Sequence, residues 1–290
     1  MLLQRVITAV VLLIVLLMVS VFLSPVSFRV FLALASAIAL WEWLRITTTG
    51  SISIATAGLY FVLAVWVGVA GFQGAPAGAS AVPWSGWLDR LAAVLAGVGL
   101  LFWTVLVPVT LRRADTGGSP VSALGSVMGV IVIGGSALGL SMMQQQYGAW
   151  FIFSFLGVIW CADTFAYFGG RHFGGPRLAP AISPGKTRSG AACGLLAAVL
   201  WMAITLWIDG SFAAFLGQSL SLPVVLLMGA ILAIYSMIGD LYESLLKRRA
   251  GVKDSSQLLP GHGGVWDRFD SIVSVTPVVL ALWLLVRHYH

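Results

Sequence analysis

Long apolar segments alternate with short polar stretches along almost the whole chain. A helix needs roughly 20 apolar residues to cross the hydrocarbon core of a bilayer, and nine segments have about that length. They cover residues 6–23, 27–47, 51–72, 91–111, 121–142, 148–168, 189–208, 222–246 and 270–288. The pattern therefore predicts an all-α, polytopic integral membrane protein with about nine transmembrane helices.

The composition supports this prediction. Of the 290 residues, 59% are hydrophobic and only 9% are charged, whereas soluble domains carry about 25% charged residues. No polar stretch is long enough to fold alone, so we expect a single transmembrane domain over residues 1–290. We expect residues 1–145 to be scaffold and dimerisation helices, and residues 146–290 to be the catalytic helices and loops. The net charge of +6 does not indicate nucleic-acid binding, because there is no basic soluble domain.

Basic residues gather on one side of the predicted membrane. We number the polar connections between the predicted helices in order, with the N-terminus as zero, so that all even-numbered connections lie on one side of the membrane. Thirteen of the sixteen Lys and Arg residues fall on that side; the exceptions are Arg29, Arg90 and Arg287. Lys and Arg are enriched in cytoplasmic loops. We therefore expect a cytoplasmic N-terminus and a C-terminus on the opposite side.

The end of segment 222–246 carries a polar face. Asp240, Glu243, Ser244, Lys247 and Arg248 follow one another at offsets of three, four, seven and eight residues, which lie on one face of a helix. Snorkelling at the interface would explain the basic residues. It would not explain Asp240, about two turns deeper, where an unpaired carboxylate costs several kcal/mol. Asp240 therefore requires a cation or a basic partner.

A glycine-rich loop then leads into the last helix. Residues 260–270 read P-G-H-G-G-V-W-D-R-F-D, and the glycines allow a sharp turn close to a ligand. Asp267 and Asp270 stand at the start of the predicted helix, where acidic residues also serve as ordinary caps. Two carboxylates at the same membrane face, Asp240 and Asp267, could share a hard divalent ion such as magnesium.

A third polar stretch covers residues 160–190. Asp163 and Tyr167 are one turn apart in an apolar helix, and Ser183–Thr187 reads S-P-G-K-T, a predicted loop with a lysine and hydroxyls. The loop does not match the Walker pattern, and a basic topology determinant is the alternative interpretation. Together the three stretches contain acidic, basic and hydroxyl side chains and glycines, which are the groups that bind a polyphosphate and its metal ion. Such a site favours phosphoryl or nucleotidyl transfer to a lipid.

Residues 244–270 resemble the motif of the phosphatidate cytidylyltransferases (CDP-diacylglycerol synthases). That motif reads S-x-hydrophobic-K-R, then K-D, then H-G-G and D-R-x-D. Glu42–Trp43 and the stretch around Asp163 are also similar to the family, whereas Gly185 departs from it. The matching motif residues are Ser244, Lys247, Arg248, Lys253, Asp254, Pro260, His262, Gly263, Gly264, Asp267, Arg268 and Asp270.

The resemblance implies transfer of CMP from CTP to phosphatidate, giving CDP-diacylglycerol and pyrophosphate. It implies a homodimer in the bacterial cytoplasmic membrane, with the site facing the cytoplasm. Asp240 and Asp267 would bind magnesium, and Lys247 would act with them in catalysis. Whether a second, monovalent cation also binds is left open. Substrate binding would involve Asp163, Tyr167, Arg171, Ser183, Lys186, Thr187, Ser244, Arg248, Lys253, Asp254, His262, Gly263, Gly264, Arg268 and Asp270. The alternatives are a polyisoprenol-type lipid kinase and an ion-coupled transporter.

Overall fold

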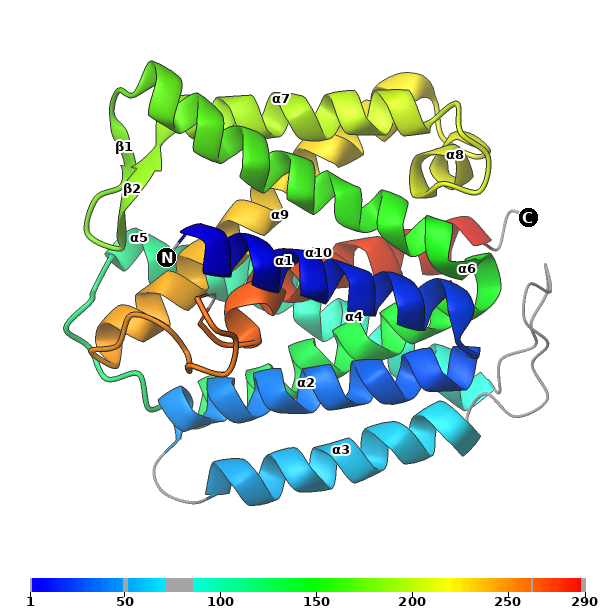
Figure 1. Ribbon diagram of the computed structural model, residues 1–290, viewed down its shortest axis with the longest axis horizontal. Helices are drawn as coiled ribbons and strands as arrows, with labels where there is room; N and C mark the ends of the chain where they lie inside the picture. Colours follow the sequence, from blue (N-terminus) through cyan, green and yellow to red (C-terminus); the bar gives the residue numbers. More distant parts are fainter. Residues whose placement is uncertain (1, 49–51, 71–85, 262, 288–290) are drawn as a thin grey trace.

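The computed structural model describes residues 2–48, 52–70, 86–261 and 263–287 and forms a bundle of helices (Figure 1). Two short π-helical segments, η1 (Met18–Phe22) and η2 (Phe102–Leu106), extend α1 and join α4 to α5. The helices are α1 (Leu2–Leu17), α2 (Pro25–Thr47), α3 (Ile52–Ala70), α4 (Gly86–Leu101), α5 (Val107–Arg113), α6 (Ala123–Phe173), α7 (Arg188–Thr205), α8 (Phe212–Gly217), α9 (Leu222–Arg249) and α10 (Trp266–Val286).

The helical prediction is confirmed, and in the described residues each of the nine apolar segments falls largely on helix. Six helical stretches are long and apolar enough to cross a membrane: α2, α4 continued through α5, α6, α7, α9 and α10. Two shorter apolar helices cover Val10–Phe22 and Ser53–Val69. A small antiparallel hairpin of β1 (Arg177–Ala179) and β2 (Ser183–Thr187) adds the strands that the sequence did not predict.

Helix α6 spans 51 residues and contains one sharp bend. Gly148 adopts φ 79° and ψ −170°, a combination that is almost restricted to glycine. The chain turns back at this point, so that the second half of α6 returns toward the hairpin end of the molecule in Figure 1. The predicted segments 121–142 and 148–168 are these two halves.

Close approaches between helices shape the part of the bundle that carries the site. A Cβ atom on Gly190 or Gly194 of α7 would meet the carbonyl oxygens of Ala166 and Ala162 on α6. Small residues of this kind let membrane helices pack closely. The second half of α6 and α7 are therefore held together just beside the hairpin, which connects them (Figure 1).

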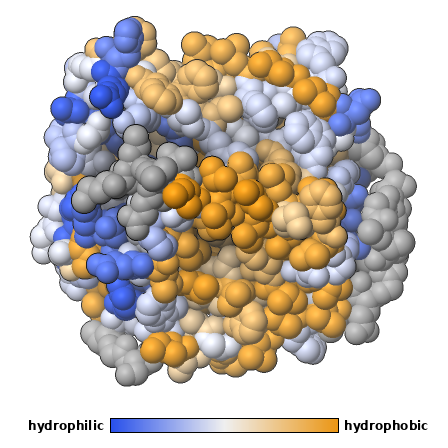
Figure 2. Space-filling view, viewed as in Figure 1, coloured by the Kyte–Doolittle hydropathy of each residue, from blue (hydrophilic) through white to orange (hydrophobic). Residues whose placement is uncertain are grey.

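The surface has polar ends and an apolar middle. Figure 2 shows hydrophilic side chains gathered at the end that carries β1, β2, α5 and the end of α9, and a broad apolar area over α1 and its neighbours. Large apolar side chains such as Leu59 and Trp207 are 62% and 81% exposed. This arrangement is typical of a membrane protein, whose apolar side chains face lipid.

Candidate active site

One large cavity opens at the hairpin end of the bundle and has a volume of about 1430 Å³. Its polar part is lined by α6, β2, α9 and α10, which supply acidic and basic side chains. Its apolar part runs between α1, α2 and α6, with Leu16, Phe28, Leu32 and Leu156 on its walls. A single space therefore joins a charged region to a region that suits hydrocarbon.

Three carboxylates meet in the charged region. Side-chain oxygens of Asp240, Glu243 and Asp270 lie within 4.8 Å of one another. Glu243 is 3% exposed, and its Oε1 atom has no hydrogen-bond partner among the described residues. Three acids this close require positive charge nearby, because like charges in a partly buried site repel strongly.

The β-hairpin supplies one such charge. The Lys186 ammonium of β2 forms an ion pair with Asp240, and the Ser244 hydroxyl donates to the same carboxylate at 3.4 Å. The expectation that Ser183–Thr187 is a loop was wrong, since these residues form β2 and pair with β1. The strand ends at Thr187, which begins α7 by accepting a hydrogen bond from the Gly190 amide at 3.1 Å.

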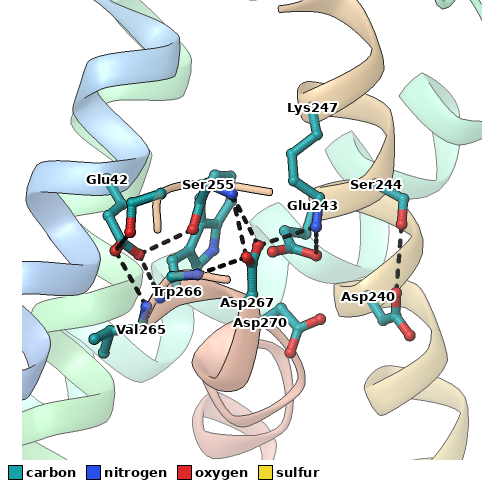
Figure 3. A network of polar contacts seen from close by, with 12 residues as sticks. Glu42, Asp240, Glu243, Ser244, Lys247, Ser255, Val265, Trp266, Asp267 and Asp270 are labelled. Carbon is teal, nitrogen blue, oxygen red and sulfur yellow. Dashed lines mark hydrogen bonds and ion pairs between the residues drawn. The ribbon is translucent and has the colours of Figure 1, made fainter. Parts of the chain in front are cut away.

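A second positive charge lies between α9 and α10. The Lys247 ammonium is 2.9 Å from Glu243 and 3.0 Å from Asp267. Asp267 also accepts hydrogen bonds from the amides of Gly264 at 2.8 Å and Ser255 at 3.2 Å (Figure 3). The carboxylate of Asp267 therefore ties the glycine loop to α10 and α9.

The predicted magnesium pair lies on two adjacent helices, Asp240 on α9 and Asp267 on α10, and both residues line the cavity. The structure groups Asp240 with Glu243 and Asp270, however, while the oxygens of Asp267 accept bonds from Lys247 and two backbone amides. The assignment of the metal to Asp240 and Asp267 thus stays a prediction.

Most of the other predicted residues also line the cavity. Asp163 accepts a hydrogen bond from Ser236 at 3.3 Å, and Arg171 donates to the Tyr167 hydroxyl at 3.3 Å. The remaining members of this group are Ser183, Lys186, Thr187, Ser244, Asp254, Arg268 and Asp270.

Two other predicted residues, Arg248 and Lys253, are not among the described residues that line this cavity. Arg248 is exposed. Lys253 lines a neighbouring cavity of about 520 Å³ together with Asp254 and Arg45. His262 lies outside the described residues.

Both predicted glycines are required by close contacts. Gly263 has φ 81°, and added Cβ atoms at Gly263 and Gly264 would collide with the carboxylates of Asp267 and Glu42, respectively.

Two acidic residues were not predicted to belong to the site. Glu243 completes the carboxylate cluster, and its spacing of three residues from Asp240 was the available signal. Glu42 of α2 is fully buried and contacts the loop that precedes α10. An acidic residue within an apolar helix was again the available signal.

Comparison with known proteins identifies the family. A model of the cytidylyltransferase family matches residues 3–286. The chain belongs to this family. Two relatives named phosphatidate cytidylyltransferase, from Pseudomonas aeruginosa and Bacillus subtilis, are each 33% identical over 97% of both chains. A third of that name, from Brucella abortus, is 45% identical over 153 residues, or 52% of this chain and 54% of the relative.

Proposed function

We propose that this protein is a phosphatidate cytidylyltransferase, which transfers CMP from CTP to phosphatidate and releases pyrophosphate. The observation that carries the proposal is the single cavity in which a cluster of charged residues continues into an apolar groove. Such a shape suits a lipid whose phosphate must meet a nucleotide. Family membership and the names of the relatives support the same reaction.

The basic residues of the cavity would hold the phosphates. Lys186, Lys247, Arg171 and Arg268 all line its charged part. In the reaction a phosphate oxygen of phosphatidate attacks the α-phosphorus of CTP, and the bond to the β-phosphate oxygen breaks. The attacking oxygen is already ionised, so the main task is to align two anions that repel each other. Cationic side chains in a partly buried site perform this alignment and stabilise the transferred group.

The carboxylate cluster fits a magnesium ion. The unpartnered Glu243 oxygen and the nearby oxygens of Asp240 and Asp270 are hard ligands of the type that magnesium binds. Bound there, the ion would neutralise negative charge on the phosphates of CTP. We therefore propose Asp240, Glu243 and Asp270 as the magnesium ligands. The alternative is the pair Asp240 and Asp267 that was predicted from the sequence.

The apolar groove would receive the acyl chains of phosphatidate. Its walls are formed by apolar side chains of α1, α2 and α6. A lipid substrate would thus keep its hydrocarbon in an apolar environment while its phosphate reaches Lys186 and Lys247.

We also propose nine membrane crossings, with the hairpin end in the cytoplasm. The 51 residues of helix α6 extend over about 75 Å at roughly 1.5 Å per residue, which is about two and a half times the ~30 Å hydrocarbon core, and the bend at Gly148 would let the helix cross twice. The ends of α1 and α10 nearest the termini lie at opposite ends of the molecule in Figure 1, which supports an odd number of crossings. An impermeant thiol reagent should label exposed Gln257→Cys only in opened cells and Gln218→Cys in intact cells, after both native cysteines are replaced.

The reaction is tested with purified protein, phosphatidate and CTP labelled at one phosphate. Cytidylyl transfer predicts that label from the α-phosphate enters the lipid product and that label from the γ-phosphate leaves as pyrophosphate. A lipid kinase would give the opposite result, and a transporter would give no labelled lipid. The inactive control is Asp240→Asn.

The metal assignment is tested by comparing Asp267→Asn with Asp270→Asn. If Asp240, Glu243 and Asp270 hold the ion, Asp270→Asn should raise the magnesium concentration needed for half-maximal activity at least tenfold. Asp267→Asn should then lower activity without that shift. The reverse pattern would favour the pair Asp240 and Asp267. A homodimer, which the resemblance implies, also stays a prediction and is tested by the mass of the purified particle.

A further inference from the structure

Glu42 is a buried acidic side chain whose carboxylate accepts hydrogen bonds from four different donor groups. It is 0% exposed. Its carboxylate accepts bonds from the Trp266 amide at 2.6 Å, the Val265 amide at 3.1 Å and the hydroxyls of Ser255, at 3.0 Å, and Ser256 (Figure 3). All four donors belong to one segment, residues 255–266, more than 200 residues away in sequence.

Two of these contacts lie at the start of α10. Val265 and Trp266 offer amide groups that the helix itself cannot satisfy, and the N-terminus of a helix attracts negative charge. A buried carboxylate is costly unless such donors surround it. An apolar side chain could fill the same space but would leave these buried donors without an acceptor, so the carboxylate is explained by the donors it satisfies and not by packing alone. Glu42 instead holds the orientation of the first turn of α10.

The same contacts continue into the active site. The Ser255 hydroxyl donates a hydrogen bond to Glu42, and the Ser255 amide donates one to Asp267. Asp267 pairs with Lys247, and Lys247 pairs with Glu243 of the carboxylate cluster. A continuous series of hydrogen bonds and ion pairs therefore joins α2 to the cluster on α9 (Figure 3).

Neighbouring contacts also hold the described residues of this segment against α2. Trp43, the next residue of α2, packs against Trp266 with ring centroids 4.8 Å apart. Arg45 donates to the Ser255 carbonyl at 2.6 Å. A Cβ atom on Gly264 would collide with the Ser255 hydroxyl and the Glu42 carboxylate, so the loop lies directly against α2. Glu42 itself is not among the described residues that line the cavity.

We propose that Glu42 is a positioning residue for nucleotidyl transfer. By anchoring residues 255–256 and the first turn of α10, it determines where the carboxylates of Asp267 and Asp270 lie relative to Lys247 and Asp240. This inference rests on the proposed function. It assigns to α2, in the predicted scaffold half, a direct role in the geometry of the site.

The test is Glu42→Gln, which keeps the size of the side chain but replaces one acceptor oxygen by a donor NH2 group. Serine hydroxyls can rotate to accommodate this change, whereas the amides of Val265 and Trp266 cannot. Misplacing reacting groups by about 1 Å can cost roughly 100-fold in rate. We expect kcat to fall about 10- to 100-fold, with the apparent KM values for CTP and phosphatidate changing less than about threefold.

The structural readout is hydrogen–deuterium exchange of the ligand-free protein in detergent. In Glu42→Gln the amides of residues 254–270 should exchange faster, while those of α7 stay unchanged. Ser255→Ala/Ser256→Ala, which removes two of the four donors but leaves the backbone intact, should produce a weaker form of both effects. Glu42→Asp should lie between the wild type and Glu42→Gln.

The matched control is Thr47→Val, an isosteric change of another buried polar residue of α2 whose hydroxyl bonds to Trp43 and Ser126. It should leave kcat and the exchange of residues 254–270 unchanged. Wild-type kcat in Glu42→Gln, or faster exchange throughout the bundle, would overturn the proposal. If the wild-type protein itself transfers no CMP, the proposed function fails, but the exchange data still decide whether Glu42 anchors the segment.

Discussion

Removing the Lys247 ammonium should leave two buried carboxylates facing each other. Lys247 has a side chain that is 13% exposed, and its partners Glu243 and Asp267 are each 4% exposed. One oxygen of each lies 2.9 or 3.0 Å from the ammonium, so these oxygens are at most about 6 Å apart. Lys247→Met removes the charge and keeps much of the apolar stem.

The size of the effect follows from Coulomb's law. Two unit charges about 6 Å apart repel by about 2.8 kcal/mol when the effective dielectric constant is about 20. Breaking a buried ion pair by removing one partner generally costs about 3–5 kcal/mol. We therefore expect Lys247→Met to lower the free energy of unfolding by about 3 kcal/mol. The measurement is an unfolding titration with SDS in mixed micelles, followed by tryptophan fluorescence.

A second substitution separates repulsion from other causes. Adding Glu243→Gln to Lys247→Met removes one of the two repelling charges and should restore most of the lost stability. Glu243→Gln alone should cost less than Lys247→Met, because Lys247 keeps Asp267 as a partner. Transferase activity should stay low in the double variant, since the ammonium that would bind phosphate is still missing. If the double variant is no more stable than Lys247→Met, electrostatic repulsion is not the reason for the loss.

Three further predictions concern β2, the glycine loop and the groove. Lys186→Ala should raise the KM for CTP or lower kcat at least tenfold with normal membrane insertion; wild-type kinetics would leave β2 only a structural role. Gly264→Ala should lower the free energy of unfolding by about 1–3 kcal/mol and reduce activity. The control Gly185→Ala, whose added Cβ has open space, should not change stability. Equal stability losses of the two variants in unfolding titrations would contradict this prediction. Leu156→Trp should raise the KM for long-chain phosphatidate but not for CTP, and an equal effect of the exposed control Leu200→Trp would argue against the groove.

The helices were predictable from the sequence because their cause is local. An apolar run of sufficient length must satisfy its backbone hydrogen bonds within itself in lipid, and this requirement depends on no distant residue. The polar residues of the site were visible for a related reason. Charged groups such as Asp163 and Asp240 are costly in an apolar helix, so each one indicates that a partner exists. The motif at residues 244–270 added the identity of the chemistry, but only through resemblance.

The partners themselves were decided by the tertiary structure. The spacing of Asp240 and Asp267 did not show that Lys186 would reach the first and Lys247 the second. Those pairings depend on how β2, α9 and α10 pack, which involves contacts between residues far apart in the sequence. The short hairpin was missed because its five-residue strand β2 contains proline and glycine, which are typical of loops.

Glu42 shows the same limit most clearly. The sequence shows it as an acid within an apolar helix, a position where a charge needs compensation. Only the packing of α2 against the start of α10 reveals the compensation, which comes from four donors on a segment more than 200 residues away. Local sequence determines which groups need partners, whereas the three-dimensional arrangement of the helices determines which partners they find, because hydrogen bonds and ion pairs act only over a few ångströms.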